Sequence, residues 1–247
     1  MKKLLFILLS YSLMAAPVTN PASPGILEQG LFIPDTVWTQ PRASFLEDFT
    51  TQERLHCTAS PSSVQKTFMS GNSQLGAVTW SIKERFDASL ILGTSNNVFR
   101  LFEGAQLVEF HTSGGLVWYG EGKLILIEMK ETSFSIFGEA GGWDWMSGPY
   151  FINDEPISNS NLKLRFWEAG AAFTQRIGFF TPYFGIAVLQ SRWKMSSPTH
   201  ITYRFTQKHT TGPFLGCTLS TSSKVSLNVE WRGWFENSLN VAGEIRF

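Results

Sequence analysis

The chain closes with the stretch Leu239-Asn240-Val241-Ala242-Gly243-Glu244-Ile245-Arg246-Phe247, in which apolar residues recur at alternate positions. Successive side chains of a β-strand point to opposite faces. One face of this stretch would carry Leu239, Val241, Ile245 and Phe247, and the other would carry Glu244 and Arg246. A membrane β-barrel commonly ends in this way, because its last strand pairs with the first and turns its apolar face to lipid.

The other end of the chain predicts export. Lys2 and Lys3 precede an apolar run at 4–9, and the small residues Ala15 and Ala16 follow, which is the pattern of a cleaved signal peptide. The run is shorter than the roughly 20 residues that span a bilayer. We therefore expect a signal peptide at 1–15. An irregular, Pro-rich N-terminal extension should follow at 16–41, and the barrel at 42–247.

Composition narrows the fold class. Charged residues make up only 16% of the chain, below the roughly 25% of ordinary globular proteins. No segment after the signal peptide is apolar for long enough to be a membrane helix. A closed barrel is the other way to cross a bilayer, and a secreted β-sandwich is the rival fold. The formal net charge of zero gives no reason to expect nucleic-acid binding.

Short alternating segments separated by turn residues predict an all-β, transmembrane, antiparallel up-and-down barrel of about twelve strands, with ten to fourteen acceptable. The expected strands are 42–53, 74–83, 86–94, 98–110, 112–120, 123–130, 133–144, 161–175, 180–193, 211–220, 224–233 and the closing stretch. Long loops are expected at 54–73, 146–160 and 194–210, all on the outer side. Short connections are expected near 84, 177 and 222 on the periplasmic side.

Four stretches together resemble the chlamydial major outer-membrane porin family. They are Ala16-Pro17-Val18-Thr19-Asn20-Pro21-Ala22, Arg85-Phe86-Asp87-Ala88-Ser89-Leu90-Ile91-Leu92-Gly93-Thr94, Phe180-Thr181-Pro182-Tyr183-Phe184-Gly185-Ile186 and the terminal Arg246-Phe247. The chain is shorter than that family's porins and lacks their many cysteines and long variable loops. The resemblance therefore implies a compact paralogue in the outer membrane.

The polar strand faces should line the lumen. The candidates are Lys83, Asp87, Glu230, Arg232, Glu244 and Arg246, of which the last four are expected close together on neighbouring inner walls. They would form either a charged constriction that sorts solutes or a salt-bridge network that plugs a narrow barrel. The balanced signs predict no strong ion selectivity. Interfacial girdle positions are expected for Trp118, Trp143, Trp145, Trp193 and Trp231.

A catalytic reading rests on His111-Thr112-Ser113, with Asn96 and Asn97 nearby in sequence. An outer-membrane phospholipase uses a His and a Ser two residues apart on a barrel wall, with an Asn that orients the His. His111 and Ser113, however, fall on the polar face, whereas such an enzyme needs them to face lipid. We therefore expect no enzyme and keep the phospholipase as a remote alternative.

The leading hypothesis is an outer-membrane porin-like protein through which small hydrophilic solutes diffuse. The rival is a structural or surface-interaction barrel with a plugged lumen. Expected partners are outer-membrane lipid and lipopolysaccharide, together with the barrel-assembly machinery, which would read Phe247, Ile245 and Val241. A homo-oligomer is left open, as is pairing of Cys57 and Cys217 with each other or with another chain. No motif predicts a cofactor or a metal site.

Overall fold

The computed structural model describes residues 39–59, 64–82, 85–103, 106–129, 131–153, 155–196, 202–220, 225–234 and 236–246. The expected signal peptide, most of the N-terminal extension, Lys83 and Phe247 lie outside these residues. Eleven strands are described: β1 (Thr39–Ala59), β2 (Val64–Ile82), β3 (Phe86–Glu103), β4 (Gln106–Met129), β5 (Thr132–Ile152), β6 (Glu155–Gln175), β7 (Phe180–Ser196), β8 (Thr202–Gln207), β9 (Thr211–Ser220), β10 (Val225–Arg232) and β11 (Glu236–Arg246).

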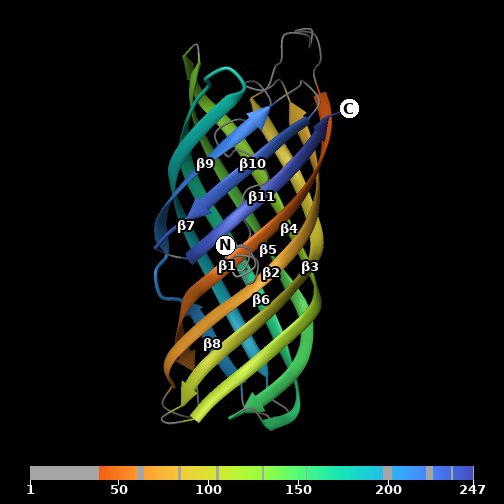
Figure 1. Ribbon diagram of the computed structural model, residues 1–247, viewed down its shortest axis with the longest axis vertical. Coiled ribbons are helices and arrows are strands. Elements are labelled where there is room, and N and C mark those ends of the chain that lie inside the picture. Colours follow the sequence, from red (N-terminus) through yellow and green to blue (C-terminus); the bar gives the residue numbers. More distant parts are fainter. Residues whose placement is uncertain are drawn as a thin grey trace, which may run out of the picture.

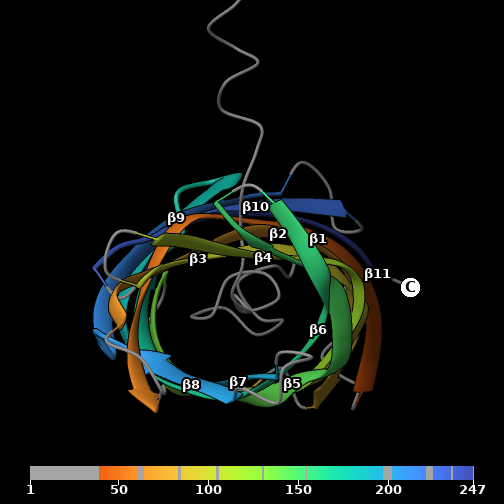
Figure 2. The ribbon, with the colours of Figure 1, turned by 90° about the horizontal axis from the view of Figure 1, so that it is seen from below.

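All strand pairs are antiparallel, and they close into a tall barrel (Figures 1 and 2). Strands β1 to β7 run side by side in sequence order. The ring then closes differently at its two ends. At one end, β9, β10 and β11 fill the space between β7 and β1, which gives ten strands in the ring. At the other end, β8 alone bridges β7 and β1, which gives eight.

The two ends also differ in which face is apolar, and we name them accordingly. In the ten-stranded membrane half, outward side chains form an apolar belt that includes Val78, Trp80, Leu90, Leu92, Phe184, Ile186, Leu227 and Leu239. In the eight-stranded distal half, many outward positions are charged, as at Lys66, Arg100, Arg192, Lys194 and Arg204. Such a belt on a closed barrel is the signature of a membrane-spanning region.

The inward faces show the reverse arrangement. The membrane half encloses buried charged side chains such as Arg42 and Arg232, together with aromatic ones such as Tyr119, Phe137 and Phe214. The distal half encloses a mainly apolar core that includes Met69, Phe99, Phe110, Leu162, Trp193, Met195 and Phe205. The distal half is therefore built like a water-soluble barrel standing on a membrane barrel. Among the described residues, no helix is long and apolar enough to cross a bilayer.

The predicted fold class is confirmed, and the eleven strands described lie within the expected range. The breaks expected between strands 86–94 and 98–110 and between strands 112–120 and 123–130 are wrong, because β3 and β4 continue through them. Gly120 and Gly122 flank Glu121, whose side chain is buried. The pattern read as a turn is thus an inward carboxylate between two glycines on the outer face.

The three long loops predicted at 54–73, 146–160 and 194–210 are also wrong, since most of these residues belong to strands of the distal half. Their polar composition has a simple cause. In this half the polar residues face outward and only alternate residues, such as Leu55, Met69 and Tyr150, enter the core. The short connections predicted near 84, 177 and 222 do join strands, β2 to β3, β6 to β7 and β9 to β10.

The two cysteines lie in different parts of the barrel and are not joined by a disulfide. Cys57 belongs to β1 in the distal half, and Cys217 belongs to β9 in the membrane half. Cys57 is opposite Phe205, whereas Cys217 is opposite Val229 and Pro182. The internal pairing that the sequence left open is therefore absent from the fold.

Candidate functional site

The first part of the site is an ion cluster inside the membrane half, centred on Arg42 of β1. Its guanidinium donates a hydrogen bond from Nη2 to Asp87 of β3, and its Nη1 lies 3.1 Å from Oε2 of Glu244 on β11. Ser44 donates to the same Glu244 oxygen over 3.4 Å. Three strands thus meet at one buried cation. Arg42 was not among the predicted lumen residues, because it is the first residue of the expected strand 42–53, where the strand boundary was uncertain.

A second cluster is centred on Arg232 of β10, which is completely buried. Arg232 Nη1 lies 2.6 Å from Oε2 of Glu168 on β6, and Nε lies 2.7 Å from Oε1 of Glu230. Glu236 of β11 approaches to 3.7 Å. The hydroxyl of Tyr183 donates to Glu230 Oε2 over 2.9 Å. This cluster ties β6, β7, β10 and β11 together across the inside of the barrel.

The predicted lumen residues therefore fall into separate groups. Asp87 and Glu244 share the Arg42 cluster, whereas Glu230 and Arg232 belong to the second one. The expectation that Glu244 would meet Glu230 and Arg232 is wrong, since Glu244 is opposite Ser226, four residues along β10 from Glu230. The side chain of Arg246 lies outside what the structure describes, as does Lys83.

The interior is rich in acid. Nine carboxylic acids but only three bases are buried among the described residues: Asp48, Glu53, Asp87, Glu121, Glu139, Glu168, Glu230, Glu236 and Glu244 against Arg42, Lys123 and Arg232. The balance of signs among the six candidate residues stays a prediction, because Lys83 and the side chain of Arg246 lie outside the described residues, but the described interior as a whole holds an excess of acid. The chain is neutral overall because many of its other bases lie outside, on the distal half. Any ion path through this interior would favour cations.

Aromatic rings fill the distal half from wall to wall. Trp193 of β7 lies 4.9 Å, centroid to centroid, from Phe99 of β3 and 5.0 Å from Trp143 of β5. Phe110 of β4 adds a further ring 6.2 Å from Phe99. In a ring of eight strands β3 and β7 are opposite each other, so the contact of Phe99 with Trp193 spans the lumen. We call these four residues the aromatic plug.

The prediction that Trp143 and Trp193 belong to an interfacial girdle is wrong. Trp143 and Trp193 were expected in an interfacial girdle but lie inside, each about 1% exposed. Trp118 and Trp231 do face outward, as a girdle requires, and the side chain of Trp145 is outside the described set. The signal that was available is the spacing, since Trp193 alternates with Arg192 and Lys194, which face outward.

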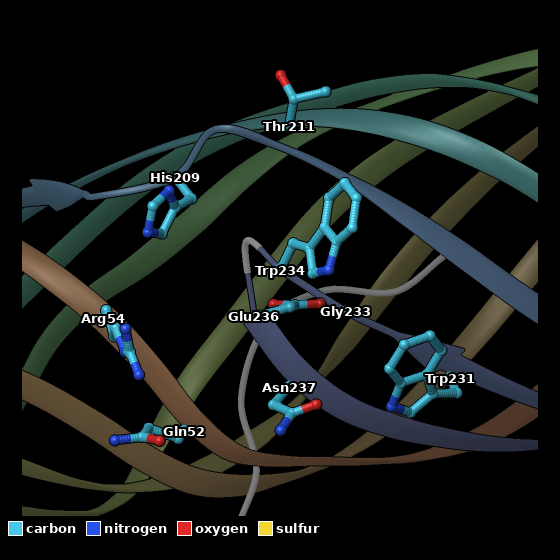
Figure 3. A pocket seen from close by; sticks show the side chains of 9 residues that line it. All are labelled: Gln52, Arg54, His209, Thr211, Trp231, Gly233, Trp234, Glu236 and Asn237. Carbon is cyan, nitrogen blue, oxygen red and sulfur yellow. The ribbon is translucent and has the colours of Figure 1, made fainter.

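A notch in the wall lies where the strand count changes from ten to eight (Figure 3). Its volume is about 560 Å³, and it is lined by Gln52, Arg54, His209, Thr211, Trp231, Gly233, Trp234, Glu236 and Asn237. Trp234 is 82% exposed and sits at a positive φ of 73° in the connection between β10 and β11. Tryptophans at the edge of an apolar belt anchor a barrel at the membrane interface.

The residues considered for a phospholipase site point to different faces of the barrel wall. His111 faces outward on the distal half, and its Nε2 lies 3.1 Å from Oε2 of Glu109. Asn97 faces inward and is buried, with its side-chain amide donating to Ser95. Asn96 Oδ1 accepts a hydrogen bond from the backbone N–H of Gly114. The described contacts thus give His111 a carboxylate partner in place of an orienting asparagine, and the side chain of Ser113 lies outside them. In the described part of the chain, no group of His, Cys, Asp and Glu could hold a metal ion.

Comparison with known proteins finds fold relatives only. No family model matches the chain, and no curated protein matches it in sequence. The outer-membrane protease OmpT from Escherichia coli aligns with 13% identity and a TM-score of 0.46, covering 89% of this chain and 100% of that one. The translocator domain of the autotransporter NalP from Neisseria meningitidis aligns with 11% identity and a TM-score of 0.43, covering 84% and 87%. The Pseudomonas putida toluene transporter TodX aligns with 8% identity and a TM-score of 0.40, covering 91% and 92%.

At these identities the likeness concerns the fold alone. The chain forms a closed antiparallel β-barrel with an apolar belt around one half, which is the fold class of transmembrane barrels. The activities named for the three relatives differ from one another, so fold does not select one of them.

Proposed function

We propose that this protein is a non-conducting outer-membrane barrel that carries a folded, water-exposed half-barrel at the cell surface. Its role would be structural or interactive, and it would not let solutes pass. The sequence suggested this structural or surface-interaction barrel with a plugged lumen as the alternative to a porin. The leading porin hypothesis has less support, because a porin needs a continuous aqueous path along its axis.

The single observation that carries the proposal is the contact of Trp193 with Phe99 across the distal lumen. Both side chains are fully buried, and Trp143 packs on the same indole at 5.0 Å. Side chains of an eight-stranded barrel are long enough to fill its interior. Ions would also have to cross the buried pairs of Arg42 and Arg232 in the membrane half. Packed rings and a paired guanidinium both oppose such a path.

The polarity of the two halves supports an orientation for the barrel. β1 begins in the membrane half, and β11 ends there. Single-chain barrels of this class keep both termini in the periplasm. The distal half would then stand outside the cell. We further propose that the chain is a compact relative of the chlamydial major porins, in which a packed interior has replaced the pore. The four short stretches of resemblance support that relationship.

Planar-bilayer conductance of the refolded protein tests the proposal. We expect the parent barrel to be silent. Replacing the plug pair, in Phe99→Ser with Trp193→Ser, should admit water to the distal half and produce small channel events, limited by the pairs of Arg42 and Arg232 that remain. The matched control is Phe68→Ser with Phe102→Ser, which removes another aromatic pair, 6.5 Å apart, from neighbouring strands of the distal half. Phe102 of that pair is exposed.

The control pair should remain as silent as the parent. All three proteins must first show heat-modifiable migration on a gel, which reports a folded barrel. Stable single-channel steps from the folded parent would overturn the proposal and restore the porin hypothesis.

A further inference from the structure

An unusual set of cations lies on the outer face of β6, β7 and β8 in the distal half. Lys163 of β6 is directly opposite Lys194 of β7, which is directly opposite Arg204 of β8. One step nearer the membrane half, Arg165 of β6 is directly opposite Arg192 of β7. We call these five residues the cationic rows. Five like charges thus stand in register on three neighbouring strands.

Cations placed in this way destabilise a sheet. Directly opposed residues of antiparallel strands have Cβ atoms about 5 Å apart, and like charges at that spacing repel. Lys194 meets a cation on each side. Within the described part of the chain, Arg192, Lys194 and Arg204 have no carboxylate partner. Asp144 of β5 lies at the break in the β5–β6 pairing between Trp143 and Met146, and its side chain lies outside the described set.

The rows lie just beyond the apolar belt. Two residues from Arg165 and Arg192 toward the membrane half, Trp167 and Gln190 form the next opposed pair, and Trp167 Nε1 donates to Gln190 Oε1 over 2.9 Å. The outward pairs that follow are apolar: Ala169 with Val188, Ala171 with Ile186 and Phe173 with Phe184. Two residues span about 6.6 Å of strand. That is comparable with the roughly 5–7 Å of headgroup region on each side of a bilayer core.

Tryptophan marks the membrane interface, so cations one and two steps beyond Trp167 meet the headgroup phosphates. We propose that the cationic rows bind the phosphate groups of a phosphorylated glycolipid in the outer leaflet. Guanidinium groups bind phosphate oxygens in a bidentate manner, and lysine binds them as a point charge. The two rows are about 6.6 Å apart along the strands, which suits several phosphates on one headgroup better than a single small anion.

This site rests on the proposed orientation, in which the distal half stands outside the cell, but it does not depend on the lumen being closed. It also gives the expected lipopolysaccharide contact a place on the barrel. The competing occupant is a soluble polyanion, such as a sulfated polysaccharide, held by the same cations. The position beside the belt favours lipid, because a soluble chain has no reason to bind at the membrane edge.

Native mass spectrometry of the detergent-solubilised barrel, titrated with diphosphorylated lipid A, tests the assignment. The test variant is Arg192→Gln with Lys194→Gln and Arg204→Gln. The matched control is Arg54→Gln with Lys66→Gln and Lys208→Gln, which removes three other exposed cations and gives the same net charge. The test variant should bind about 100-fold more weakly than the parent, since each base near an anionic surface contributes roughly fivefold. The control should stay within about threefold of the parent, because distant exposed charges contribute little once screened.

A stability measurement separates binding from a structural role. In neutral detergent the test variant should unfold at a higher temperature than the parent, because it no longer opposes like charges. Added diphosphorylated lipid A should reverse that order, and dephosphorylated lipid A should not. A structural role for these side chains predicts a lower unfolding temperature in both conditions.

Three results would overturn the assignment: equal losses of lipid A binding in the test and control variants, undiminished binding in the test variant, or displacement of lipid A by heparin at equal concentration of anionic groups. The last result would assign the cationic rows to a soluble polyanion.

Discussion

Arg232→Met should be among the most damaging single substitutions in the membrane half. Arg232 lies within 4 Å of three carboxylates, those of Glu168, Glu230 and Glu236. Methionine keeps an unbranched chain but removes the charge and every donor. The carboxylates would then face one another in an interior that already holds an excess of acid.

The magnitude follows from the burial of the cluster. Removing one partner of a buried ion pair costs about 3–5 kcal/mol, because it leaves an uncompensated buried charge. Since Arg232 serves three acids, we place its loss at the upper end of that range. The ratio of folded to unfolded protein should therefore fall by more than about 100-fold. Glu236→Gln should cost about 1 kcal/mol or less, because it removes the most distant of the three partners and relieves the excess of acid.

Urea unfolding of barrels refolded into lipid vesicles, followed by tryptophan fluorescence, measures these differences. Adding Glu168→Gln to Arg232→Met should recover part of the loss. The deficit of Arg232→Met should also shrink as the pH falls, because the carboxylates left without a cation then bind protons and lose their repulsion. A loss below about 1 kcal/mol, or a deficit that does not change with pH, would show that the cluster does not hold these strands together.

Two further substitutions test the polarity and the packing of the barrel. Val229→Arg places a charge on the lipid face of β10 and should reduce heat-modifiable folding, since such a charge costs roughly 2–4 kcal/mol near the bilayer midplane. Gln74→Arg, outward on β2 beyond the belt, should fold like the parent, and equal defects in the two variants would contradict the boundary between the halves. Gly141→Ala should lower the free energy of unfolding by about 1–3 kcal/mol, because a Cβ there would overlap Trp118 O and Tyr119 on the neighbouring strand. Gly243→Ala, which meets nothing within 4 Å, should change stability by less than about 0.5 kcal/mol, and a comparable loss would contradict its outward position.

The sequence predicts the membrane half well because lipid imposes a simple rule there. Outward residues must be apolar, so the alternation of Val225, Leu227, Val229 and Trp231 with polar residues defines both the strand and its faces. Asp87, Glu230, Arg232 and Glu244 are inward for the same reason. Their partners were harder to find, because pairing across the lumen depends on strand register. Arg42 meets Asp87 across β2, and no local pattern reports that contact.

The same rule mispredicts the distal half, because there the apolar side chains point inward and many outward side chains are charged. A rule that sends apolar residues outward would expose Trp193 and Met195, which are buried here beside outward Arg192 and Lys194. Without a lipid-facing run, segments such as 54–73 resemble loops. Period-two alternation was nevertheless present in them. In β7 the side chains keep alternating between the two faces, but after Val188 the outward residues change from apolar to polar and charged. Such a change along one strand would have indicated the boundary between the two halves.

The step from ten strands to eight links these features. Barrel diameter grows with strand number, and eight strands give an interior that side chains can fill. The ten-stranded ring is wider, so its interior is bridged by long charged side chains such as Arg42 and Arg232. Once β8 replaces three strands, the walls approach and Phe99 meets Trp193. The same replacement leaves the notch beside Trp234, because the turn between β10 and β11 ends where the distal wall continues (Figure 3). It also brings Arg204 into register with Lys194, so the short strand β8 both narrows the lumen and completes the cationic rows.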